Sequence, residues 1–211
     1  AALKPYRFWA RYSTNQLEMR IGLQKINFGS AVILRPLMWF DQLDPRDPLQ
    51  LSNGVWALLG RYYFLNNANL WLWGLYGNMQ TKTWELAKTA EKTPEFGGRL
   101  QIPILKGDAA VSCHFRQADT QLLFDSVSGN PNTPEQRIGL DGKWDVGPGI
   151  WFESAWIHKS VNSGPATNQE IITVGTDYTF GIGNGLNVVF EHMIYGYGEE
   201  AFDFSERLSF S

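Results

Sequence analysis

Polar and apolar residues alternate at every second position along much of the chain. Between residues 134 and 146, Arg137 and Asp141 occupy one set of alternate positions, and Ile138 and Leu140 occupy the other. Successive side chains of a β-strand point to opposite faces of the sheet. The pattern therefore predicts strands with one polar face and one apolar face.

This alternation predicts about eleven strands. Most of them are about 10–13 residues long, whereas strands of soluble proteins average about 5–6 residues and a tilted membrane-crossing strand needs about 9–11. The two segments 55–65 and 70–76 are apolar on both faces, so the pattern does not orient them. The remaining predicted strands span residues 6–13, 16–24, 95–104, 107–117, 134–146, 150–159, 169–180, 185–197 and 202–210.

Short and long connections alternate between the predicted strands. Short turns are expected at 14–15, 66–67, 105–106, 147–149 and 181–185, and longer loops at 27–54, 78–94, 118–133, 160–168 and, less extended, 198–201. Outer-membrane barrels have tight periplasmic turns and extended outer loops. We therefore expect an all-β, transmembrane, antiparallel up-and-down β-barrel that forms a single domain over residues 1–211. Such barrels have an even number of strands, so about 11–12 visible strands predict that at least one N-terminal strand is missing.

Composition restricts the alternatives. The chain of 211 residues has a formal net charge of −3 and no run of Lys or Arg, which gives no indication of a nucleic-acid partner. Its one cysteine, Cys113, excludes an internal disulfide and a cysteine-based metal cluster. No apolar run approaches the roughly 18 residues of a membrane helix, but barrels place their apolar residues at alternate positions. We expect no cofactor, no bound metal and no enzymatic activity.

The polar face of a membrane barrel points to its interior. In one interpretation, the charged residues of this face line a water-filled channel that favours anions and carboxylate-bearing solutes. The alternative is that Arg and Glu pair with one another and fill a closed interior, and the predicted hairpins would place Lys143 opposite Glu153 and Glu95 opposite Arg116. The predicted pore-lining residues are Arg7, Arg11, Glu18, Arg20, Gln24, Arg61, Glu95, Arg99, Arg116, Arg137, Lys143 and Glu153.

Aromatic residues gather near the ends of the two apolar strands. Tryptophan and tyrosine are enriched where a barrel meets the two membrane interfaces. We therefore interpret these residues as an aromatic girdle, with a stacking track for sugars as the alternative. They are Trp56, Tyr62, Tyr63, Trp71, Trp73 and Tyr76.

One stretch of the chain has a recognisable motif. Residues 20–29 contain Arg20, Gly22, Gln24, Asn27 and Gly29 in the pattern R-x-G-x-Q-x-x-N-x-G, and the loop that follows reads D-P-x-D-P at 44–48. About thirty residues resemble a porin-like bacterial outer-membrane family whose members are mostly uncharacterised. The sequence departs from the commoner pattern at Phe28, where tryptophan is usual. The resemblance implies an outer-membrane location and a transport-like role, but no substrate.

The long connection at residues 27–53 is charged and contains three prolines. We expect it to fold into the barrel and form a constriction, with an ordinary outer loop as the alternative. Carboxylates at 41, 44 and 47 would also suit a calcium ion, although an EF-hand spacing is absent. The expected constriction residues are Arg35, Asp41, Asp44, Arg46 and Asp47.

The sequence thus predicts an outer-membrane porin or channel for passive diffusion of small polar solutes, anions included. Its expected partners are outer-membrane lipid and lipopolysaccharide of a Gram-negative bacterium, and its oligomeric state is left open. A sealed structural or adhesion barrel is one alternative. The other is a lipid hydrolase, because His158 and Ser160 form a His-x-Ser pair like that of the outer-membrane phospholipase family. The predicted strands place no Asn or Asp beside this pair to orient the base, as a triad requires.

Overall fold

A computed structural model describes residues 7–41, 53–121, 132–202 and 207–210. These residues form eleven β-strands, as the alternation predicts. The strands are β1 (Phe8–Ser13), β2 (Leu17–Gln24), β3 (Val55–Tyr63), β4 (Asn69–Tyr76), β5 (Pro94–Ile104), β6 (Gly107–Asp119), β7 (Asn132–Asp145), β8 (Gly149–Lys159), β9 (Asn168–Phe180), β10 (Leu186–Gly198) and β11 (Arg207–Phe210).

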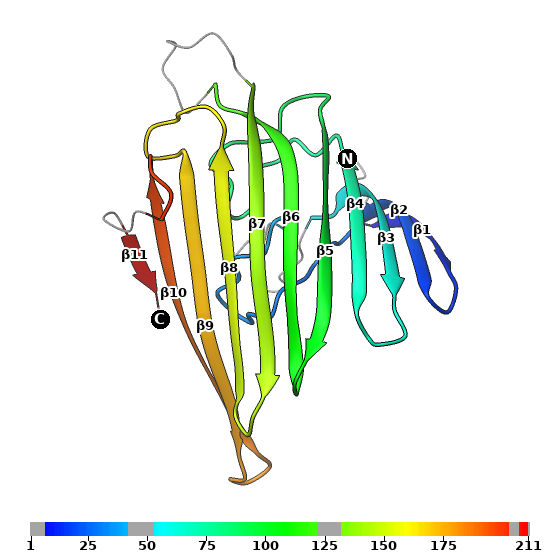
Figure 1. The fold of residues 1–211 in the computed structure, drawn as a ribbon, viewed down its shortest axis with the longest axis vertical. Helices are drawn as coiled ribbons and strands as arrows, with labels where there is room; N and C mark the ends of the chain where they lie inside the picture. The colour runs from blue at the N-terminus through cyan, green and yellow to red at the C-terminus, as the bar shows by residue number, and fades with distance from the viewer. Residues whose placement is uncertain (1–6, 42–52, 122–131, 203–206, 211) are drawn as a thin grey trace, which may run out of the picture.

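Each strand pairs antiparallel with its neighbour in the sequence. The result is one up-and-down sheet in the order β1 to β11, with β1 and β11 at its two edges (Figure 1). This confirms the predicted all-β, up-and-down architecture. Among the described residues the sheet is not closed into a barrel, because no pairing joins β1 to β11. No helix within the described ranges is long and apolar enough to cross a membrane.

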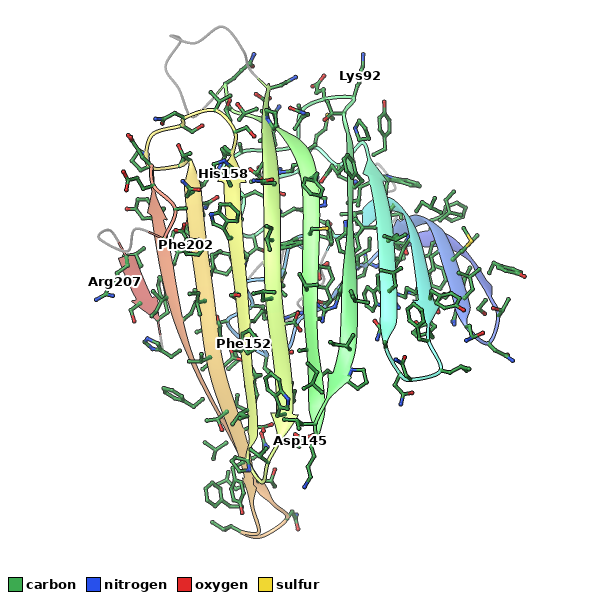
Figure 2. All side chains as sticks on the ribbon, in the orientation of Figure 1. Lys92, Asp145, Phe152, His158, Phe202 and Arg207 are labelled. Carbon is green, nitrogen blue, oxygen red and sulfur yellow. The ribbon has the colours of Figure 1, made fainter. Side chains whose placement is uncertain are left out.

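Short and long connections lie at opposite ends of the sheet. Figure 1 shows the tight hairpin turns at the lower end and the long connections at the upper end. We call these the turn end and the loop end; Figure 2 marks them with Asp145 and Lys92, respectively. The predicted turn at Leu105–Lys106 is confirmed by the pairing of Ile104 with Gly107.

The two faces of the sheet differ sharply. Residues 25–41 and 77–93 contact one face, which we call the covered face, and the other is the open face. On β7, Arg137 and Asp141 are buried on the covered face, while Ile138 and Leu140 are exposed on the open face. The predicted separation into polar and apolar faces is therefore confirmed for this strand, and β6 follows the same rule, whereas the covered face of β8 also holds Trp151, Ala155 and Ile157.

The structure also orients the two apolar strands. Leu59 of β3 and Trp73 of β4 are register partners, and both are buried on the covered face. They pack with Ile26, Phe28 and Trp39 of the connection between β2 and β3 in one apolar cluster. Apolar side chains occupy both faces here because one face packs against this connection. Sequence alternation is therefore absent from β3 and β4.

Two details of the predicted strands are wrong. Strands β1 to β3 have 6–9 residues, shorter than predicted. In the β7–β8 hairpin Asp145 pairs with Gly149, so Glu153 lies opposite Asp141 rather than opposite Lys143. The reason is that the turn begins one residue earlier than expected, which moves the facing position by two residues.

Candidate functional site

The covered face holds the predicted pore-lining residues. Arg7 precedes β1, and the other eleven lie on strands at covered-face positions. Most of them are buried beneath residues 25–41 and 77–93 and bind specific partners. Their role as pore lining stays a prediction, and their contacts define five groups.

Glu191 of β10 binds the backbone of the covering segment 25–41. Val32 N donates to its Oε1 at 2.6 Å, while Ile33 N and Leu34 N donate to its Oε2 at 2.9 and 2.6 Å. The indole Nε1 of Trp151 donates to Oε1 at 2.8 Å. Consecutive backbone N–H groups that converge on one carboxylate form an anion-binding nest. Glu191 thus holds residues 32–34 against the sheet.

Glu153 and Asp141 complete this attachment. Glu153 accepts hydrogen bonds from Ala31 N at 2.9 Å and from Leu37 N at 2.5 Å, one on each oxygen. The hydroxyl of Ser30 donates to Asp141 Oδ2 at 3.1 Å. Carboxylates on β7, β8 and β10 therefore tie down residues 30–37. These contacts hold residues 30–37 on the covered face, and the expected constriction stays a prediction.

Residues of the sequence motif have local structural roles. Gly22 has a φ of 123°, and a Cβ atom there would collide with the backbone of Phe8 on β1. The amide of Gln24 is buried and donates to the carbonyl of Ala57 at 2.9 Å. Both contacts join neighbouring strands before the chain leaves the sheet. The motif therefore shapes the exit from β2.

Gly29 gives a first prediction. Its φ is 101°, and a Cβ atom there would collide with the carboxylate of Glu153. Gly29→Ala should therefore displace Glu153 from Ala31 and Leu37 and destabilise the attachment by roughly 1–3 kcal/mol. Faster chymotrypsin cleavage within residues 37–40 would report it. Gly181→Ala is the control, because a Cβ atom on that turn glycine meets nothing; equal cleavage of the two variants would contradict the assignment.

The second covering segment contributes a buried acid that the sequence did not indicate. Glu85 Oε1 lies 3.1 Å from Arg116 Nη1 and 2.8 Å from Arg137 Nη2. Arg116 also donates to the carbonyl of Ala87 at 2.8 Å and to the hydroxyl of Thr89 at 3.1 Å. One guanidinium group thus fixes residues 85–89 on the covered face. Part of the predicted loop at 78–94 therefore packs on the covered face.

Glu135 of β7 joins the same network from the sheet. Arg116 donates to its two oxygens at 2.6 and 3.0 Å, in the bidentate geometry typical of strong guanidinium–carboxylate pairs. Arg137 donates to Oε1 at 2.8 and 2.9 Å, and Lys159 Nζ lies 3.7 Å from Oε2. All four side chains are buried. Three buried cations thus share Glu135 and Glu85, and these direct ion pairs favour a structural role.

A separate pair lies between β5 and β7. Arg99 donates to both oxygens of Asp141, at 2.5 and 2.9 Å, and to the hydroxyl of Ser112 at 3.1 Å. Both charged side chains are about 96–97% buried. This pair supports the interpretation in which opposite charges fill the interior.

His114 and Glu95 form a neutral–anionic pair beside the apolar cluster. His114 Nε2 lies 3.1 Å from Glu95 Oε2, and the indole of Trp73 donates to His114 Nδ1 at 3.2 Å. Because an indole only donates, Nδ1 accepts and Nε2 carries the proton that Glu95 accepts. The register pairs Phe96 with Phe115, one residue from the predicted facing of Glu95 and Arg116, but the Glu95 carboxylate binds His114 and Arg116 binds Glu135.

Cations outnumber acids near the turn end of β1 to β3. Glu18 Oε2 lies 2.8 Å from Arg11 Nη2, while its Oε1 lies 2.7 Å from Arg20 Nε and 3.6 Å from Arg61 Nη1. Three guanidinium groups thus surround one carboxylate, and we call these four residues the arginine cluster. Its charge is not balanced within the described residues.

The predicted constriction residues are only partly described. Asp44, Arg46 and Asp47 lie outside the described residues. Arg35 donates to the side chain of Asn27 and to the carbonyl of Phe28, the latter at 3.0 Å. These contacts brace the segment internally, so the Arg35 guanidinium faces its own segment.

Asp41 sits where the two covering segments meet. It is buried and forms an ion pair with Lys25 at 3.5 Å, and its carbonyl accepts a hydrogen bond from the Thr83 hydroxyl at 2.9 Å. Burial lowers the pKa of the nearby Lys82 ammonium from its usual value, although the charges of Glu85, Glu95 and Asp41 oppose this shift. Polar contacts therefore join the two covering segments over the covered face.

The aromatic residues divide between the faces. Trp56, Tyr62 and Tyr76 are exposed on the open face. Trp73 is buried in the apolar cluster, and Trp71 lies under Arg61, so these two do not form a girdle. That part of the prediction is wrong, because β4 turns its tryptophans toward the covering segment.

One polar group lies at the loop end of β8. His158 Nδ1 is 2.8 Å from Asn168 Oδ1, and Asn168 Nδ2 donates to the carbonyl of Glu199 at 2.8 Å. His158 also stacks on Trp156, with ring centroids 5.4 Å apart (Figure 2). The expectation that no Asn lies beside this histidine is wrong, because β9 begins with Asn168. No hydrogen bond joins Ser160 to His158.

Comparisons with known proteins do not extend this assignment. No protein-family model, curated protein or solved structure matches the chain. Function is therefore inferred from the geometry of the two faces and of their charged groups.

Proposed function

We propose that this sheet is the wall of a transmembrane β-barrel of the Gram-negative outer membrane and that the barrel admits small polar solutes, anions in particular. The resemblance of residues 20–29 and 44–48 to the porin-like family agrees with this proposal. Closure would require further strands to pair with the free edges of β1 and β11. The long connections would then lie outside the cell and the tight turns in the periplasm.

The observation that carries the membrane assignment is the inverted distribution of side chains. Large apolar residues on the open face are exposed along its strands, among them Phe96, Leu140 and Phe190 at 58%, 47% and 56%. Meanwhile Arg99, Arg116 and Arg137 are buried on the other face. Monomeric soluble proteins rarely expose a large contiguous apolar surface. A lipid-facing wall with a polar interior has this distribution.

The covering segments favour a narrow passage over a wide pore. Residues 25–41 and 77–93 cover the sheet, and the Arg99–Asp141 and Arg116–Glu135 pairs fill much of the interior toward them. The arginine cluster remains accessible near the turn end, because 47% of the Arg11 side chain and 22% of the Arg20 side chain are exposed. This arrangement favours selective entry of small anions.

Recording from planar bilayers tests the passage. Protein refolded into lipid should give discrete conductance steps, and a potassium chloride gradient should give a reversal potential shifted toward that of chloride. The absence of steps, from protein that resists proteolysis and is rich in β-structure, would leave a sealed barrel instead. A cation-selective reversal potential would contradict the anion preference.

A substitution pair tests the membrane assignment independently of transport. Leu140 lies in the middle of β7 on the open face, and Leu105 is 94% exposed in the β5–β6 turn. Leu140→Arg should lower the free energy of unfolding in lipid by about 2–4 kcal/mol, whereas Leu105→Arg should change it by about 0–1 kcal/mol. Equal effects, measured by denaturant unfolding in vesicles, would contradict a lipid-facing Leu140.

The hydrogen bond between His158 and Asn168 favours lipid hydrolysis as a second candidate function. It orients the imidazole so that Nδ1 carries the proton and Nε2 is free to act as a base toward Ser160. A phospholipase assay on the protein in mixed micelles tests this function. Activity that disappears in Ser160→Ala but persists in the control Ser154→Ala would support it, and no activity above the buffer rate would exclude it.

A further inference from the structure

The arginine cluster has a larger excess of cations than the other ion-paired groups described on the covered face. Arg99 pairs one to one with Asp141, while Arg116, Arg137 and Lys159 share Glu135 and Glu85. In the cluster, Glu18 is the only acid that forms an ion pair with Arg11, Arg20 and Arg61 within the described residues. The excess of two positive charges is unfavourable unless anions reach it.

The cluster is also open to small solutes. The side chains of Arg99 and Arg116 are 4% and 0% exposed, whereas those of Arg20 and Arg61 are 22% and 14% exposed. Arg11 is exposed to 47% on the edge strand β1. Charge excess and access thus coincide at one place on the covered face.

Aromatic rings hold two of the guanidinium groups in place. The Cζ atom of Arg61 lies 3.7 Å from the ring centroid of Trp71, and that of Arg20 lies 5.2 Å from that of Trp9. Stacking on a ring restrains the guanidinium plane and leaves its N–H edge available for a planar oxyanion. The site is therefore partly preorganised before any ligand arrives.

Hydrogen-bonding capacity at the cluster is incompletely used. The buried Nε atom of Arg61 makes no hydrogen bond. The same is true of Asn69 Oδ1 and Trp71 Nε1 on the adjacent strand β4. Buried polar atoms in proteins are normally paired, so such a concentration marks a place built for a further partner.

We propose that Arg11, Arg20 and Arg61 bind one oxyanion group, a carboxylate or a phosphate, of a small solute. Guanidinium groups are suited to both groups because two parallel N–H donors match two oxygens. The inference rests on the proposed function in placing this site on the solute's path. Binding itself is measured without a membrane, so its failure is distinguishable from failure of transport.

Isothermal titration calorimetry of the detergent-solubilised full chain tests the site, with inorganic phosphate and succinate as separate probes. The double variant Arg20→Gln and Arg61→Gln should weaken binding at least about tenfold, the loss of one strong charge-assisted contact. Lys106→Gln, in a turn at the same end of the sheet, is the control and should bind within about twofold of the original. Circular dichroism would show that each variant is folded.

Glu18→Gln should change the anion affinity in the opposite direction. A neutral amide no longer competes with the ligand for the three cations, so anion affinity should rise severalfold; a purely structural Glu18 would predict unchanged or weaker binding. Binding of phosphate alone or of succinate alone would identify the recognised group. Absence of binding by both probes, or equal affinities for the original chain and the double arginine variant, would overturn the proposal.

Discussion

Replacing both Glu153 and Glu191 by glutamine should detach residues 30–37 from the covered face. Each carboxylate accepts backbone N–H groups on both oxygens, whereas an amide offers one acceptor and turns a donor toward the other N–H. Charge-assisted hydrogen bonds contribute roughly 1.5–3 kcal/mol each, so two lost bonds should raise the open population roughly 100-fold. Chymotrypsin cleavage after Trp39 and Phe40, both buried, should accelerate accordingly.

The matched control carries the same charge change elsewhere. Glu91 and Glu200 are exposed near the loop end, and their double replacement by glutamine should leave cleavage unchanged. In planar bilayers the Glu153 and Glu191 variant should also show larger conductance steps, because its passage is wider. Unchanged cleavage would show that the apolar cluster alone holds the segment. Faster cleavage with unchanged conductance would show that the segment does not narrow the passage.

Much of the sheet was predictable because its period of two is a local property. Arg137 and Asp141 alternate with Ile138 and Leu140, so both faces of β7 follow from the sequence. Strand order was predictable too, since antiparallel neighbours joined by tight turns need no long-range information. Register was less secure, as the Lys143–Glu153 error shows, because one residue at a turn moves every facing pair.

The covering segments were harder to anticipate. Glu85 lies in a stretch without periodicity, and nothing local indicates that it reaches Arg116 and Arg137 across the covered face. Glu191 has the correct parity on β10, but its partners are backbone N–H groups, which carry no residue-type signal. Contacts between a side chain and a distant backbone thus depend on tertiary structure. The packing of residues 25–41 on the sheet was foreseeable only from the prolines and charges of the whole connection at 27–53.

The largest expected effect on stability concerns the buried ion pairs of Arg116. Arg116→Met should lower the free energy of unfolding by about 3–5 kcal/mol, because it leaves Glu135 and Glu85 buried with fewer counter-charges. Denaturant unfolding in detergent measures the loss. Arg207→Met on β11, an exposed position, should cost no more than about 0.5 kcal/mol.

Comparison of Arg61→Met with Arg116→Met tests whether the arginine cluster and the ion pairs of Arg116 have different roles. Arg61 is mostly buried, but its removal relieves repulsion with Arg11 and Arg20 and leaves Glu18 two guanidinium partners. We therefore expect it to cost less than about 1 kcal/mol, comparable to a surface ion pair, while it weakens anion binding. If Arg61→Met and Arg116→Met destabilised the protein equally, both groups would serve the fold, and the cluster would not be reserved for a ligand. A large loss of stability in Arg116→Met alone would mean that different arginines stabilise the fold and bind the ligand.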